Sequence, residues 1–216
     1  MVGMTPQARP GKKLGTTSYA VLGLLALRDW TTYELAQQME RGIRRMWAAS
    51  PSMVYEEPKH LVAHGYAEVR ESPVGRRPRS SYSITPLGRQ ALAAWLAELP
   101  APPALQFEGI LKVLFADQGD ASTNVHVLEA IEQQAAEYRA VAVERGRGYR
   151  DGEYIAGVDL EGRAVVVAQT LAFLAEFHAL VERWAAWSAD LARSPDAGER
   201  AQQTFIAVAA GRRVLR

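Results

Sequence analysis

Residues 74–88 constrain the fold of this 216-residue chain more than any other segment. They read V-G-R-R-P-R-S-S-Y-S-I-T-P-L-G. Gly75 and Pro78 favour a turn, and the turn carries three arginines, Arg76, Arg77 and Arg79. The alternation at 81–84 indicates a short strand, and the Thr-Pro pair at 85–86 is typical of a helix start. The segment therefore predicts an arginine-rich β-hairpin that leads directly into a helix.

The residues before this hairpin have the apolar spacing of helices. Three helical segments and one strand are predicted, at 16–28, 32–43, 50–64 and 66–71 respectively. In the third helix Pro51 takes the favoured first position, but Pro58 removes a backbone hydrogen bond and crowds the carbonyl four residues earlier. We therefore expect a bend or a broken turn between Val54 and Pro58.

Three helices followed by a basic hairpin and a further helix, to about residue 99, are typical of a winged helix-turn-helix. Three prolines, Pro100, Pro102 and Pro103, then mark a domain boundary. Beyond them the pattern is helical throughout, at 105–116, 122–147, 161–193 and 197–210, with glycines 146, 148, 152 and 157 predicted to form the loop between the two long helices.

We expect a mainly α fold with a small β-hairpin wing and three regions. A flexible basic tail at 1–15 precedes a winged helix-turn-helix DNA-binding domain at 16–99 and a helical dimerisation domain at 104–216. The assignment of dimerisation follows from the long apolar stripe of the second half, which needs a partner surface that so few helices of one chain do not supply.

Charge is divided unevenly along the chain. Residues 1–90 hold 13 Lys and Arg against 7 Asp and Glu, a balance of +6, whereas the remainder holds 12 against 17, a balance of −5. Such asymmetry indicates nucleic-acid binding at one end. The absence of cysteine excludes disulfides, thiolate metal sites and a Cys nucleophile. With no secretory signal, and with apolar segments interrupted by charges before about 20 residues, we expect a cytoplasmic protein.

Several stretches of the first half resemble the PadR family of bacterial transcriptional regulators, specifically its longer subgroup with a helical C-terminal domain. They are Y-A-V-L-G-L-L-A-L at 19–27, T-Y-E-L at 32–35, Trp47 with 50–55, K-H-L at 59–61, Gly65, G-R-R-P-R at 75–79, and Y-S-I-T at 82–85 with Gly88. The second half is similar through L-K-V-L-F-A-D at 111–117 and its two long helices. The family commonly has leucine or a similar residue where this chain has Pro58.

The resemblance implies that the helix after Ser50 enters the major groove of double-stranded DNA, whose phosphates the hairpin grips. The expected recognition-helix residues are Ser50, Ser52, Tyr55 and Lys59, the wing residues are Arg76, Arg77, Arg79 and Ser80, and the flanking contacts are Arg44 and Arg45. The basic tail with Arg9, Lys12 and Lys13 is either a DNA-contacting arm or a disordered terminus.

Aromatic residues of the chain are candidates for a pocket that binds a planar effector at the dimer interface, as in ligand-responsive members of the family. They are Trp95, Phe173, Phe177, Trp184 and Trp187, and their alternative role is ordinary core or interface packing. His60 and His64 have a metal-compatible spacing but no third ligand nearby in the sequence, so no metal and no cofactor are expected.

The leading hypothesis is a homodimeric repressor that binds a pseudo-palindromic operator. One alternative is a winged-helix adaptor that binds only proteins, which the +6 balance of the first half disfavours. An enzyme is the other, and the sequence has no G-x-S-x-G elbow, no phosphate-binding G-x-x-x-x-G-K-[ST] loop and no H-E-x-x-H motif.

Overall fold

The computed structural model describes residues 14–42, 47, 51–74, 77–152, 158 and 161–215. The side chains of residues 51–54, 72–74, 77–79 and 161 are outside this description. The chain forms two compact units, Met1–Pro102 and Pro103–Arg216, each with its own internal packing. Each unit is considered by itself.

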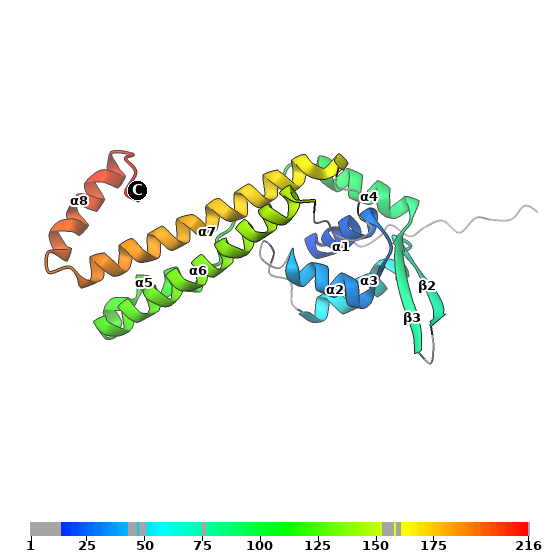
Figure 1. Cartoon of the computed structure of the whole chain (residues 1–216), viewed down its shortest axis with the longest axis horizontal. Helices are drawn as coiled ribbons and strands as arrows, with labels where there is room; N and C mark the ends of the chain where they lie inside the picture. The colour runs from blue at the N-terminus through cyan, green and yellow to red at the C-terminus, as the bar shows by residue number, and fades with distance from the viewer. Residues whose placement is uncertain are drawn as a thin grey trace, which may run out of the picture. The chain divides into compact units, whose positions relative to one another are not determined.

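The first unit is a bundle of helices with a small sheet (Figure 1). Its elements are α1 (Thr16–Leu27), β1 (Trp30–Thr31), α2 (Thr32–Arg41), α3 (Pro51–Ala63), β2 (Ala67–Val74), β3 (Arg77–Ile84) and α4 (Pro86–Ala97). Helices α1, α2 and α3 meet through fully buried apolar side chains, which are Val21, Leu22, Leu25, Leu35, Met39, Pro58 and Leu61. Burial of these side chains stabilises the packing of the helices against one another. The element order and the sheet confirm the predicted mainly helical fold with a small antiparallel hairpin.

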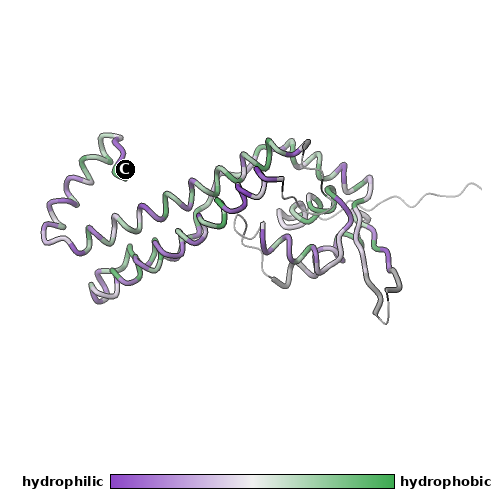
Figure 2. The backbone as a smooth tube through the Cα atoms, viewed as in Figure 1, coloured by the Kyte–Doolittle hydropathy of each residue, from purple (hydrophilic) through white to green (hydrophobic). Residues whose placement is uncertain are grey.

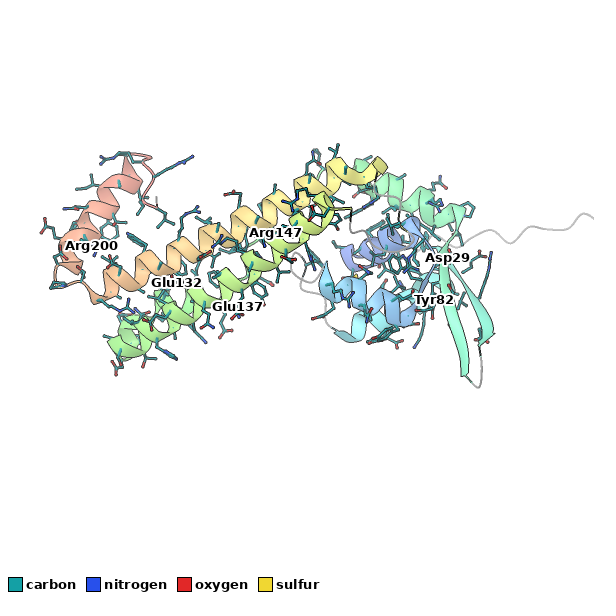
Figure 3. The ribbon with its side chains drawn as sticks, in the orientation of Figure 1. Asp29, Tyr82, Glu132, Glu137, Arg147 and Arg200 are labelled. Atoms are coloured by element: carbon teal, nitrogen blue, oxygen red, sulfur yellow. The ribbon has the colours of Figure 1, made fainter. Side chains whose placement is uncertain are left out.

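The sheet has three antiparallel strands in the order β1-β3-β2. Tyr82 on the central strand pairs with Trp30 on one side and with Val69 on the other, and its ring is buried (Figure 3). Trp30 is fixed by a hydrogen bond from its indole N–H to the Leu24 carbonyl, 2.7 Å, and by the Arg28 guanidinium, 3.5 Å from the ring centre. Strand β1 thus joins the hairpin to α1.

Helix α2 begins with a complete capping box. The Glu34 backbone N–H donates to Thr31 Oγ1, and the Glu34 carboxylate accepts from the backbone N–H and hydroxyl of Thr31 at 2.9 and 2.6 Å. Hydrogen bonds from the Thr31 side chain and backbone, with a weaker contribution from Arg28, lower the pKa of Glu34 to about 2. The start of α2 is therefore fixed directly after β1.

The second unit is built on two long antiparallel helices that lie side by side, α6 (Ala121–Arg150) and α7 (Ala164–Arg193) (Figure 1). The shorter helix α5 (Glu108–Leu114) contacts α6, and the shorter helix α8 (Ala197–Ala209) contacts α7. The prediction that Gly146 and Gly148 form a loop was wrong, because α6 continues to Arg150. Gly146 lies where α7 comes close: a Cβ there would be 3.5 Å from the Leu171 side chain.

Helix α7 is long and apolar enough to cross a membrane by length and composition alone, although Glu176 and Glu182 interrupt its apolar residues, as expected from the sequence. Figure 2 shows hydrophobic residues recurring along it. One side of α7 packs on α6 through Leu174, Ala185 and Ala189, and Arg139 of α6 forms an ion pair with Glu182 at 2.5 Å. On the other sides of α7, apolar side chains are exposed, since no other part of the chain that the structure describes covers them.

Candidate nucleic-acid interface

Helix α3, the predicted recognition helix, runs without interruption from Pro51 to Ala63. The expected broken turn between Val54 and Pro58 is therefore wrong, and a bend within the continuous helix stays a prediction. Pro58 is fully buried in the packing of α3 on the core. Burial of the ring on this side compensates for the one backbone hydrogen bond that proline removes, so the helix stays continuous.

The opposite side of α3 carries exposed polar side chains. Tyr55 is 48% exposed, and the side chains of Lys59 and Glu56 are 61% and 71% exposed. Lys59 Nζ lies 2.9 Å from Glu56 Oε1, and the hydrogen bond to this carboxylate raises the pKa of Lys59. Tyr55 and Lys59 thus face outward as the sequence predicts, but Lys59 is engaged by an acidic neighbour.

The inner edge of α3 is tied to α1 by polar contacts. Glu57, with a side chain only 13% exposed, accepts a 2.5 Å hydrogen bond from the Ser18 hydroxyl and lies 3.2 Å from His60 Nδ1. The Trp47 indole donates to Thr17 Oγ1 at 3.2 Å. The Glu57 contact holds the orientation of α3 on α1 and therefore the direction in which its outer face points, whereas Trp47 lies before α3 in the chain and contacts α1 separately.

His60 and His64 contact each other on α3, with ring centres 4.3 Å apart and tilted planes. Within the part of the chain that the structure describes, no group of three or more His, Asp or Glu side chains is arranged to hold a metal ion. The nearest polar partners of the two rings are Glu57 and the His60 backbone carbonyl. The pair is a local feature of the helix.

The junction between α3 and the hairpin is fixed by backbone contacts. Gly65 ends α3 with φ of 76°, a left-handed conformation that favours glycine. The Thr85 hydroxyl donates to the Gly65 carbonyl at 2.7 Å and accepts from the Gly88 N–H at 3.1 Å, while the Thr85 N–H donates to the Tyr66 carbonyl. One threonine thus joins the end of α3, the base of the hairpin and the start of α4.

The hairpin pairs β2 with β3 over eight residues each, from Ala67 opposite Ile84 to Val74 opposite Arg77. Arg77 and Arg79 therefore belong to β3, which corrects their expected place in the turn. Ser80 is half-buried. The predicted contacts Ser50, Arg44, Arg45 and Arg76 lie outside the described residues, and for Ser52, Arg77 and Arg79 only the backbone is described.

Four of the five aromatic residues expected in an effector pocket are divided among three separate ring contacts. Trp95 stacks on Tyr19 in the first unit at 4.8 Å, and in the second unit Phe173 stacks on Phe177 and Trp184 meets Phe107 edge-on. Trp187 is half-buried. At a rise of about 1.5 Å per residue, Phe173 and Trp187 lie about 21 Å apart along α7. The aromatics of α7 therefore do not line one small pocket within a single chain.

Glu56, Glu57 and Trp47 were missed as site residues by the sequence reasoning. A signal for Glu56 exists, since about 100° of rotation per residue puts it nearly opposite the buried side of the helix defined by Pro58 and Leu61. The contacts of Glu57 with Ser18 and of Trp47 with Thr17 join residues 39 and 30 positions apart, which helical periodicity does not reveal.

Comparison with known proteins agrees with this geometry. Residues 21–94 match the model of the transcriptional regulator PadR-like family. The negative transcriptional regulator PadR of Bacillus subtilis is 30% identical over 99 residues, which are 45% of this chain and 54% of that protein. The chain spans about half the length of the curated relatives it matches.

Solved structures resemble a larger share of the chain. Bacillus subtilis PadR in complex with operator DNA has a TM-score of 0.67 at 19% identity and covers 82% of this chain and 99% of its own. The same protein in complex with p-coumaric acid has a TM-score of 0.55 at 20% identity and covers 80% and 98%. At these identities the likeness establishes the fold, and the family match identifies the N-terminal domain. Residues 21–94 of the chain form a domain of the transcriptional regulator PadR-like family.

Proposed function

We propose that this protein is a dimeric, sequence-specific DNA-binding regulator of transcription, acting in the cytoplasm as a repressor. The observation that carries the proposal is the outward face of α3, where Tyr55 and Lys59 are exposed, followed at once by a hairpin that carries Arg77 and Arg79. A helix for the major groove and a basic strand for the adjacent backbone are the two parts that a winged helix-turn-helix needs.

In this proposal the two parts have different roles. Tyr55, Lys59 and Ser52 contact base edges, while Ser50 lies near phosphate at the start of the helix. The wing arginines, Arg76, Arg77 and Arg79, together with Ser80, bind phosphates and supply affinity with little sequence preference. Arg44 and Arg45 add flanking contacts. The partly buried Glu57–Ser18 contact holds α3 on α1, and Thr85 joins the end of α3 to the base of the hairpin.

The proposal includes a homodimer formed by the second unit. Apolar side chains of α7 are exposed in the single chain, among them Val165, Val166 and Phe173, the last at 67%. Exposed apolar area of this extent marks an interaction surface in a protein that is not in a membrane. A two-fold axis through this unit presents two α3 helices to two half-sites of one operator.

The proposal also includes an aromatic effector that releases the protein from DNA. The stacked rings of Phe173 and Phe177 form an apolar aromatic surface on α7, next to the face that a second subunit would cover. The complex of Bacillus subtilis PadR with p-coumaric acid is the motive for testing phenolic acids first. We expect such a ligand to quench tryptophan fluorescence and to release DNA, and a broad panel without either effect would contradict this part alone.

The decisive experiment is a gel-shift titration of a labelled fragment from the promoter of the protein's own gene. The full-length protein is compared with a variant in which Arg76, Arg77 and Arg79 are replaced by Gln. We expect a shift at low salt for the wild type and a large loss for the variant. No shift at low salt would refute the proposal and favour the protein-binding adaptor. Equal binding by the wild type and the variant would also refute the proposal.

A further inference from the structure

The outward face of α3 has a carboxylate near its centre. Counted at about 100° per residue, Glu56 lies about 10° from the direction opposite the midpoint of Pro58 and Leu61, whereas Lys59 and Tyr55 lie further round. Glu56 has the most exposed side chain of the three, at 71%. If α3 enters DNA, Glu56 therefore meets the groove more directly than the residues that the family resemblance singles out.

A carboxylate in this position does not bind phosphate, because both groups are anionic and both are acceptors only. Its presence weakens any binding that relies on charge alone. In the free protein its charge is balanced by Lys59, whose ammonium lies 2.9 Å away. The pair therefore places one acceptor and one donor side by side on the face of the helix.

We propose that Glu56 is a specificity-determining residue that reads a cytosine in the major groove, an inference that rests on the proposed function. The edge of a C·G pair offers the N4 amino donor of cytosine beside the O6 and N7 acceptors of guanine. Glu56 accepts from the cytosine amine, and Lys59 donates to the paired guanine. The acceptor–donor order of the two side chains matches the donor–acceptor order of that base pair.

The alternative bases fit less well. Adenine also offers an amino donor, but its N7 acceptor lies next to it and faces the second carboxylate oxygen. Thymine offers an acceptor and a methyl group, which leave the carboxylate without a partner in the groove. The carboxylate thus favours cytosine and weakens binding that relies on phosphate contacts alone. Both effects increase the preference of the protein for its operator over other DNA.

The test is selection of binding sites from a random duplex library by the full-length protein, followed by sequencing. Wild type is compared with Glu56→Ala, which removes the acceptor, and with Glu56→Gln, whose amide suits the N6 and N7 of adenine. Glu137→Ala is the matched control, because it removes one exposed carboxylate from helix α6 of the other unit (Figure 3). Circular dichroism checks that all four proteins are folded.

We expect the wild-type motif to contain one cytosine per half-site whose preference falls at least about fivefold in Glu56→Ala, the low end of base discrimination. Glu56→Gln moves that position toward adenine, and Glu137→Ala leaves the motif unchanged. An unaltered motif in Glu56→Ala, or a uniform gain in affinity for every sequence, would overturn the assignment while leaving DNA binding intact. No enrichment by the wild type would overturn the proposed function itself.

Discussion

Gly88 in the first turn of α4 gives a sharp stability prediction, because its backbone touches the base of the wing. A Cβ at this position would lie 2.1 Å from the Tyr66 carbonyl oxygen and 2.9 Å from Ile84 Cγ1. The Tyr66 carbonyl also accepts from the Thr85 N–H, so it cannot move away without loss of that bond. Relief of the overlap therefore requires the junction of α3, hairpin and α4 to shift.

The magnitude follows from two opposing contributions. Alanine is the better helix former by about 1 kcal/mol, whereas overpacking costs about 1–3 kcal/mol, and an overlap with backbone is at the upper end. We expect Gly88→Ala to lower the free energy of unfolding of the first unit by about 2 kcal/mol. For a domain of this size that corresponds to a melting temperature lower by roughly 8–16 °C.

Gly23 in α1 is the matched control, because it is also a helical glycine but a Cβ there would meet nothing within 4 Å. Gly23→Ala should raise the stability of the same unit by about 0.4–1 kcal/mol. Hydrogen–deuterium exchange of peptides from α1, compared with peptides from α6, measures the first unit separately from the second. Equal protection of α1 in the two variants would refute the reasoning.

Further predictions concern single contacts. Glu34→Gln should lower the unfolding free energy by about 1–2 kcal/mol at neutral pH. Folding depresses the pKa of Glu34 to about 2, so the difference in unfolding free energy between wild type and variant is complete above the unfolded pKa near 4.5 and shrinks as pH falls toward 2. Urea titrations at several pH values measure this difference, and a value that stays constant with pH would count against the capping box. Leu61→Ala should cost about 2–5 kcal/mol, since the side chain is fully buried between α3 and the core, and a loss under 1 kcal/mol by denaturant unfolding would contradict this packing. A double-mutant cycle on Arg139 and Glu182 should give only a small coupling energy, because both side chains are partly exposed; a large coupling energy would mean that the pair is screened from water.

Much of the fold was predictable because its signals are local. The basic hairpin, the Thr85-Pro86 helix start and the long apolar helices follow from turn chemistry, capping and periodicity. Strand β1 was missed because two residues are too few to show alternation. Its place in the sheet depends on the pairing of Trp30 with Tyr82, 52 positions away in the chain.

Two of the errors have the same physical origin, because packing overrides local preference in both. Pro58 reads as a helix breaker, yet its burial keeps α3 continuous. Gly146 reads as a loop residue, yet it lies in α6 beside Leu171, where α7 approaches closely. The outward direction of Tyr55 and Lys59 on α3 follows from helical periodicity, whereas the ion pair of Lys59 with Glu56 was not predicted.

The most direct test of the central claim is the salt dependence of binding to the promoter fragment, measured by fluorescence anisotropy. For the wild type, we predict that the logarithm of the binding constant falls linearly with the logarithm of the salt concentration. Replacing Arg76, Arg77 and Arg79 by Gln should make this slope shallower by about 0.9 per lost phosphate contact, or about 5 for the three arginines in both subunits. Binding whose salt dependence is the same with and without these arginines would contradict the role of the wing.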